Sequence, residues 1–156
     1  DPYVFDFLSL AEGYTEKQLE DALAHNITRF LLELGSGFAF VGRQMELRMP
    51  NGQSYFPDMV FYHIKMRCYV VVELKVVEFM PEFAGKLNFY VSAADHLLRS
   101  AEDNPTIGLL ICRSKDETIV QWSLEGVNKP IGVASYQLQE IVEETLNAKE
   151  LGSVNA

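Results

Sequence analysis

A nine-residue run from Tyr69 to Val77 constrains the fold of this chain most, because five valines surround one glutamate and one lysine in it. A run this rich in β-branched residues predicts a strand at the centre of a sheet, covered on both faces. Side chains alternate along a strand, so Glu73 and Lys75 should share one face while Val72 and Leu74 share the other. Two charged side chains inside a buried strand indicate either a functional site or a structural ion pair.

The rest of the chain predicts helices and strands that alternate around this central strand. Thr15 suits the N-cap of a first helix, and Pro50-Asn51-Gly52 supplies turn chemistry between two strands. A helical crossover precedes the fourth strand, which should therefore run parallel to the third. In chain order we expect a leading segment at 1–14, a helix at 15–34, strands at 38–49, 54–63 and 68–79, a helix at 81–99, a strand at 106–112, a short helix at 117–124, a strand at 131–136, a terminal helix at 137–148 and a frayed tail at 151–156. This order predicts an α/β fold with a mixed central sheet flanked by helices, in one domain over residues 1–150.

Composition and charge limit the classes of function. Hydrophobic residues make up 48% of the chain and charged residues 22%, which is the balance of a folded domain. The sequence has no run of about 18 apolar residues and no signal-peptide pattern. Cys68 and Cys112 lie in apolar runs without metal-ligand spacing, so we expect both to be buried free thiols. These features together predict a cytoplasmic location. The net charge of −9 argues against extensive nonspecific binding of nucleic acid, because phosphate contacts need clustered Lys and Arg. Metal-binding carboxylates also add negative charge, however, and a bound cation offsets it locally.

A second acidic residue, Asp58, is expected near the central strand. Pro57 lacks an N–H group and should bend its strand or place it at an edge, and pairing of adjacent strands would then bring Asp58 beside Glu73. Two neighbouring carboxylates repel unless a cation lies between them, and oxygen ligands favour Mg²⁺ or Mn²⁺. Lys75 beside such a metal would orient or deprotonate an attacking water, or stabilise charge on a phosphate. The spacing alone also allows a structural ion pair between Glu73 and Lys75, with Asp58 capping the bend.

Pro57-Asp58, followed after a hairpin by Glu73-Leu74-Lys75, is similar to the PD-(D/E)XK nuclease signature in order and in structural context. Longer stretches resemble the YhcG-type nuclease family of bacteria, and together they span nearly the whole chain. These stretches are residues 30–44, 67–75, 86–90, 103–108 and 128–134.

The resemblance implies a restriction-endonuclease-like αβββαβ core with an extra C-terminal strand and helix. It also implies a Mg²⁺- or Mn²⁺-dependent endonuclease acting on DNA, in which Asp58, Glu73 and the backbone carbonyl of Leu74 bind the metal and Lys75 assists the water. Members of the YhcG-type family carry this domain at the C-terminal end of a longer bacterial protein, after a helical domain expected to bind DNA. The chain begins at Asp1 rather than at a methionine, which agrees with a piece of a longer protein.

Three further residues are candidates for the site. PD-(D/E)XK nucleases often add an acidic residue from the first helix, and Glu20 borders the apolar stripe of that helix; a solvated surface position is the alternative. On the second predicted helix, Lys86 and Tyr90 share a row with Glu82. Lys86 would contact a phosphate of the substrate, with Tyr90 beside it, or would form an exposed ion pair with Glu82 above a core tyrosine.

Other functions remain open at this point. RNA is an alternative substrate to DNA, and the aromatic residues near the start leave a homodimer open. A catalytically idle nuclease-like fold that serves as an interaction or dimerisation module is the alternative to an enzyme, and the acidic balance favours that module. The histidines have no His or Cys companion at zinc-ligand spacing, and the glycines form no phosphate-binding loop.

Overall fold

The computed structural model describes residues 21–22, 25 and 37–135 of the chain. The leading segment, the terminal helix and the tail lie outside the described residues, and of the expected first helix only residues 21, 22 and 25 are described, all of them helical. In that part of the chain, no helix is long and apolar enough to cross a lipid bilayer. The described elements are β1 (Phe38–Arg43), β2 (Leu47–Arg48), β3 (Ser54–Tyr55), β4 (Met59–His63), β5 (Cys68–Glu78), α3 (Pro81–Leu97), β6 (Ile107–Ser114), α4 (Glu117–Ser123) and β7 (Ile131–Ser135).

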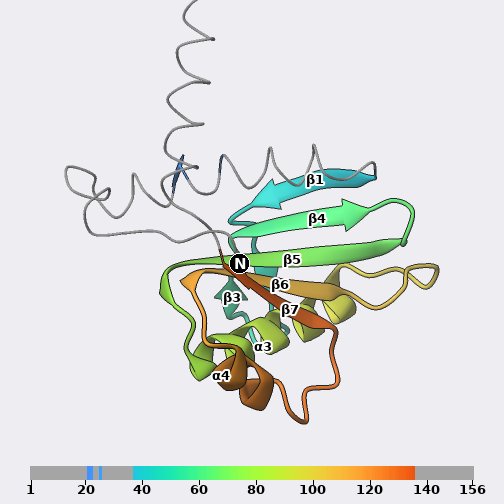
Figure 1. Cartoon of the computed structure of the whole chain (residues 1–156). Helices are drawn as coiled ribbons and strands as arrows, with labels where there is room; N and C mark the ends of the chain where they lie inside the picture. Colours follow the sequence, from blue (N-terminus) through green and yellow to red (C-terminus); the bar gives the residue numbers. More distant parts are fainter. Residues whose placement is uncertain (1–20, 23–24, 26–36, 136–156) are drawn as a thin grey trace, which may run out of the picture.

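The main sheet has five strands in the order β1-β4-β5-β6-β7, so β5 lies at its centre (Figure 1). β5 pairs antiparallel with β4 and parallel with β6. Val71 and Val72 are fully buried, and Glu73 is only 3% exposed. The predicted central, covered strand and the parallel fourth strand are therefore confirmed, as is the mixed α/β class.

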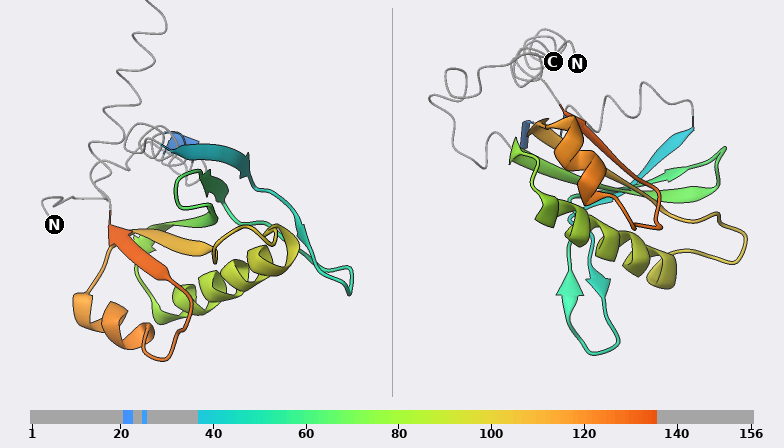
Figure 2. Two further views of the ribbon diagram at one scale, coloured as in Figure 1. Left: turned by 90° about the vertical axis from the view of Figure 1, so that its right-hand side faces the viewer. Right: turned by 60° about the horizontal axis from the view of Figure 1, so that its bottom comes forward.

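The helices α3 and α4 lie on the same side of the main sheet in both Figure 1 and Figure 2. Val71, Leu87, Val91, Leu110 and Cys112 are part of the apolar core between α3 and the sheet. Burial of this apolar area is the main stabilising term for such a layer. Both cysteines are buried free thiols, as the sequence predicts.

The expected long hairpin is interrupted, which corrects the strands predicted at 38–49 and 54–63. β1 pairs with β4 in the main sheet, whereas β2 pairs with β3 in a separate two-stranded sheet. Pro57 marks the break on one side, because proline cannot donate to the ladder, and Gln44, at φ 52°, marks it on the other. The bend expected at Pro57 is confirmed, but β4 is an inner strand and not an edge. Figure 2 shows the β2–β3 hairpin projecting from the main sheet beside α3.

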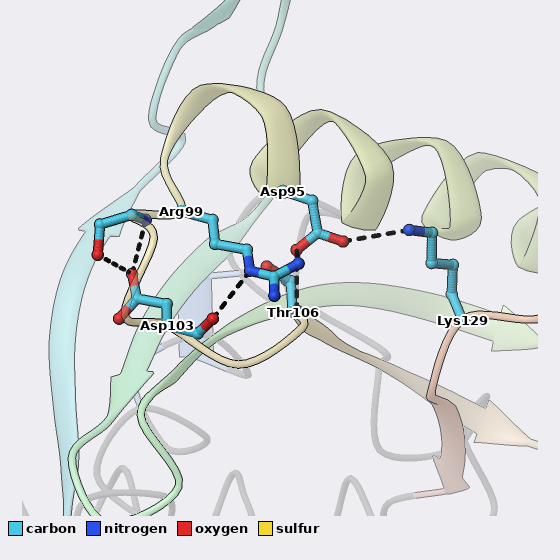
Figure 3. A network of polar contacts seen from close by, with 6 residues as sticks. Asp95, Arg99, Asp103, Thr106 and Lys129 are labelled. Carbon is cyan, nitrogen blue, oxygen red and sulfur yellow. Dashed lines mark hydrogen bonds and ion pairs between the residues drawn. The ribbon is translucent and has the colours of Figure 1, made fainter.

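A polar network ties the end of α3 to the starts of β6 and β7 (Figure 3). The carboxylate of Asp95 accepts the backbone N–H of Thr106 at 2.9 Å and lies 3.2 Å from Nζ of Lys129 and 3.7 Å from Nη1 of Arg99. Burial alone would raise the pKa of Asp95, but the Thr106 and Lys129 donors outweigh it and lower the pKa. Asp95 therefore stays ionised and fixes the crossover from α3 into β6.

Candidate active site

Asp58 and Glu73 lie side by side because of the register between β4 and β5. Met59 pairs with Val72, so one step further along the same register places Asp58 opposite Glu73 and on the same face. The backbone N–H of Asp58 donates to Oε2 of Glu73 at 2.7 Å, and the backbone N–H of Leu74 donates to Oδ2 of Asp58 at 2.7 Å. Each carboxylate is thus held by a backbone group of the strand that carries the other one.

Gln44 is a residue of the site that the sequence analysis missed. Its backbone N–H donates to the carbonyl of Asp58 at 3.0 Å, and its side-chain amide donates to Oδ1 of Asp58 at 3.0 Å. Both oxygens of the Asp58 carboxylate therefore accept a hydrogen bond, which fixes the orientation of this side chain. A signal was present in the sequence, because Gln44 ends the first stretch, residues 30–44, that resembles the YhcG-type family.

Burial and the proximity of the two carboxylates disfavour a second negative charge at this pair. Burial, followed by the charge of Asp58, raises the pKa of Glu73 to about 7. Nζ of Lys86 lies 3.9 Å from Oε1 of Glu73 and opposes this shift, but its side chain is 51% exposed and so largely hydrated. A site that raises the pKa of its own carboxyl is one in which a bound cation gains a large electrostatic stabilisation.

Lys75 lies on the α3-facing side of β5, as Glu73 does. Its Nζ lies 4.9 Å from the centre of the Phe83 ring, in the first part of α3. In the neighbouring strand β6, Lys75 is in register with Cys112, whose pKa burial raises to about 12. Phe83 and Cys112 are therefore two of the neighbours of Lys75, and the face of the Phe83 ring attracts its ammonium group.

The candidates on α3 also reach this site. Lys86 connects the carboxylate of Glu73 with the ring of Tyr90, whose centre lies 5.5 Å from Nζ of Lys86. Tyr90 is buried, and its pKa is raised by that burial and then by the charge of Glu73. Lys86 therefore has an ion-pair partner across the layer, on β5, in addition to any contact along its own helix. Glu20 lies outside the described residues.

The donor set at this point of the sheet fits a hard divalent cation. Asp58 and Glu73 offer carboxylate oxygens, and the N–H and C=O of one strand residue face the same edge, so the carbonyl of Leu74 faces Asp58 as its N–H does. Oxygen donors of this kind suit Mg²⁺ or Mn²⁺. Within the ranges that the structure describes, no group of three or more His, Cys, Asp or Glu side chains is placed to hold a metal ion. Two carboxylates and a carbonyl leave coordination positions for water and substrate.

A mixed sheet in which Pro57-Asp58 directly precedes the inner strand β4, beside Glu73-Leu74-Lys75 on β5, defines a protein of the PD-(D/E)XK nuclease class. The family model described as "YhcG PDDEXK nuclease domain" matches residues 1–151, and the chain belongs to this family. PD-(D/E)XK nucleases generally use divalent metal ions.

A curated relative supports the same assignment. The chain is 36% identical over 151 residues to the Escherichia coli (strain K12) protein described as "Putative nuclease YhcG". The match covers 97% of this chain and 40% of that protein, so the chain spans about two fifths of the length of this relative.

A solved structure shows the same fold. The crystal structure of a repair endonuclease from Pyrococcus abyssi superposes with a TM-score of 0.50 at 16% identity, covering 76% of this chain and 46% of that chain. At this level of identity the likeness concerns the fold alone, and it agrees with the expected restriction-endonuclease-like architecture.

Proposed function

We propose that this domain is a divalent-metal-dependent endonuclease that hydrolyses phosphodiester bonds of DNA. The observation that carries the proposal is the Asp58–Glu73 pair on adjacent strands, with Lys75 two residues further along the same face. Membership of the YhcG PDDEXK nuclease family supports hydrolysis of nucleic acid as the reaction.

In this proposal Asp58, Glu73 and the carbonyl of Leu74 would hold Mg²⁺ or Mn²⁺. When bound, the metal supplies a Lewis acid that polarises the phosphate and lowers the pKa of a water molecule. Gln44 keeps the Asp58 carboxylate in one orientation through its 3.0 Å hydrogen bond. Such second hydrogen bonds on ligand carboxylates commonly matter for metal affinity.

The lysines have separate tasks in the proposed reaction. Lys75 is directed by the Phe83 ring, and it orients the attacking water or stabilises negative charge that develops on the phosphate. Lys86 is half exposed beside Glu73, and it contacts a phosphate oxygen of the substrate while Tyr90 supports its side chain. We keep Glu20 as a proposed additional acidic residue, contributed by the first helix.

The decisive experiment is calorimetric titration of Mn²⁺ into the wild-type domain and into Asp58→Ala, with a plasmid-nicking assay beside it. We expect metal binding and metal-dependent nicking in the wild type and the loss of both in Asp58→Ala. Glu125→Ala, which changes an exposed acidic residue after α4, is the matched control and should behave as the wild type does. Nicking that survives Asp58→Ala would place the activity elsewhere or in a contaminant.

The second candidate is an interaction or dimerisation module built on a nuclease-like fold, and the net charge of −9 favours it. A folded wild-type domain that neither binds Mn²⁺ nor nicks DNA would support this module against the enzyme. Cleavage of matched labelled DNA and RNA strands separates the two candidate substrates. We expect DNA to be cleaved faster, and faster cleavage of RNA would reassign the substrate while leaving the nuclease in place.

A further inference from the structure

Exposed aromatic residues lie near the carboxylate pair in the sequence or are linked to it by side-chain contacts, and no step of the proposed hydrolysis uses them. Phe56 is 48% exposed and Phe89 is 37% exposed. Tyr55 packs edge to face against Phe89, with the ring centres 4.8 Å apart, and its ring centre lies 6.2 Å from that of Tyr90. We name Tyr55, Phe56 and Phe89 the aromatic platform.

The aromatic platform is joined to the site by the chain and by contacts. Phe56 precedes Asp58 by two residues, so their Cα atoms are separated by at most about 7.6 Å. On α3, Phe89 is adjacent to Tyr90, whose ring lies 5.5 Å from the ammonium of Lys86. That ammonium lies 3.9 Å from Oε1 of Glu73, so a series of contacts runs from Phe89 through Tyr90 and Lys86 to the carboxylate pair.

This arrangement matches one nucleotide of a nucleic acid. With a phosphate of the nucleic acid at the carboxylate pair, its own base or the neighbouring base comes within reach of the aromatic platform, in which Phe56 is two residues from Asp58. Lys86 then contacts the nucleic-acid backbone between the phosphate and that base. Every base has a π face that stacks on aromatic side chains, and each such stack contributes about 1–3 kcal/mol to binding of a single strand in addition to any phosphate contacts. Base stacking would be especially useful to a chain of net charge −9, because its excess of acidic residues disfavours contacts with the phosphates of the nucleic-acid backbone.

A base within a continuous duplex has both of its faces covered by neighbouring bases, so it cannot stack on a protein ring unless it leaves the stack. Resting on the proposed nuclease function, we propose that the aromatic platform binds an unpaired nucleobase next to the scissile phosphate. The substrate class is then DNA with a single-stranded stretch, a bulge or a displaced base at the cleavage point. Phe56 and Phe89 are exposed to solvent, and the β2–β3 hairpin that carries Tyr55 projects beside α3 (Figure 2).

The test measures binding separately from cleavage. Fluorescence titrations use a short DNA single strand that contains 2-aminopurine, the corresponding perfect duplex, and that duplex with one unpaired 2-aminopurine. We expect Phe56→Leu and Phe89→Leu to weaken binding of the single strand and of the bulged duplex by about 5- to 150-fold, as loss of one base–aromatic stack does. Binding of the perfect duplex and calorimetric binding of Mn²⁺ should stay within about twofold of wild type.

The matched control is Trp122→Leu, because Trp122 is 69% exposed on α4 and belongs to no part of the aromatic platform. Single-strand binding that is unchanged in Phe56→Leu and Phe89→Leu, or equally weakened in Trp122→Leu, overturns the proposal, as does a wild type that binds no DNA. Cleavage by the wild type without any preference for unpaired sites also overturns it while leaving the nuclease intact. Aromatic-dependent binding of unpaired DNA without cleavage supports the platform and contradicts the hydrolysis.

Discussion

Replacing Glu73 with glutamine should remove the pH dependence of stability that this carboxyl imposes on the metal-free protein. The pKa of Glu73 rises from 4.5 to about 7 on folding, because the carboxyl is buried and lies beside Asp58. Below about pH 4.5 the proton is bound in both the folded and the unfolded chain, so folding carries no electrostatic penalty from this group. Between about pH 4.5 and 7 the folded chain holds a proton that the unfolded chain has lost, so the free energy of unfolding falls as pH rises.

The size of the effect follows from the same two values. A carboxyl with a pKa of 4.5 when unfolded and about 7 when folded lowers the free energy of unfolding by about 3 kcal/mol once it is ionised in both states. Glutamine keeps an oxygen that accepts the N–H of Asp58, which now donates to Glu73 at 2.7 Å, and it carries no charge. The stability of Glu73→Gln relative to wild type should therefore rise by about 2–3 kcal/mol between pH 5 and pH 8.

Urea unfolding followed by circular dichroism, at several pH values with a chelator present, measures this difference. Glu82→Gln is the matched control, because Glu82 is exposed on α3 and its removal should change stability by less than about 0.5 kcal/mol at every pH. A stability difference between Glu73→Gln and wild type that does not vary with pH refutes the reasoning. Added Mn²⁺ should stabilise the wild type near pH 8, by mass action, and leave Glu73→Gln unchanged.

Two further predictions concern the scaffold that holds the site. A Cβ atom on Gly108 would lie 2.7 Å from Cγ2 of Val91, so Gly108→Ala should lower the free energy of unfolding, measured in urea titrations, by about 1–3 kcal/mol. At the control position Gly132, the atom nearest to an added Cβ is 3.7 Å away, so Gly132→Ala should change the free energy of unfolding by less than about 0.5 kcal/mol. Lys129→Met removes the 3.2 Å ion pair with the largely buried Asp95 and should cost about 1–2 kcal/mol in the same assay, and an unchanged stability would show that the remaining donors satisfy Asp95 alone.

The central strand, the crossover helix and the parallel fourth strand could be predicted because their signals are local. The five valines around Glu73 and Lys75 strongly favour a buried strand. Because side chains alternate along a strand, this prediction places both charges on one face. The proximity of Asp58 to Glu73 needed one further assumption, namely that consecutive strands pair. That assumption usually holds for strands joined by a short connection.

The contact between Gln44 and Asp58 could not be predicted, because it depends on an irregularity in the β1–β4 ladder. Phe40 pairs with Phe61, but after the bulge Gly42 pairs with Val60, so the register moves by one residue. Without this bulge Asp58 would face Arg43. A bulge is set by packing of the whole sheet and not by strand propensity, and it changes which side chain reaches the site.

The division of the expected hairpin into two sheets could not be predicted from the sequence for a related reason. Residues on both sides of the break have similar strand patterns, and the sequence does not show that Leu47 is buried in a separate small sheet. The partner of Lys86 depends on where α3 docks, since helical spacing shows only its neighbours on the same helix, whereas Glu73 lies across the layer. Docking geometry of this kind is a property of tertiary packing.

The acidic character of the chain, which argues against nucleic-acid binding when taken as a sum, has a different meaning at the site. The pKa of Glu73 is raised by burial and then by the charge of Asp58, so a cation bound there would be electrostatically favoured. In the proposed complex a bound metal ion and Lys86 contact phosphate, and base stacking adds to the affinity without a phosphate contact of its own. Each phosphate contact adds about 0.9 to the dependence of log affinity on log salt for duplex DNA and about 0.7 for a single strand. Binding of DNA by this domain should therefore depend on salt with a slope of about 1–2, and a slope near that of proteins making about 6–10 phosphate contacts would point to a basic surface outside the described residues.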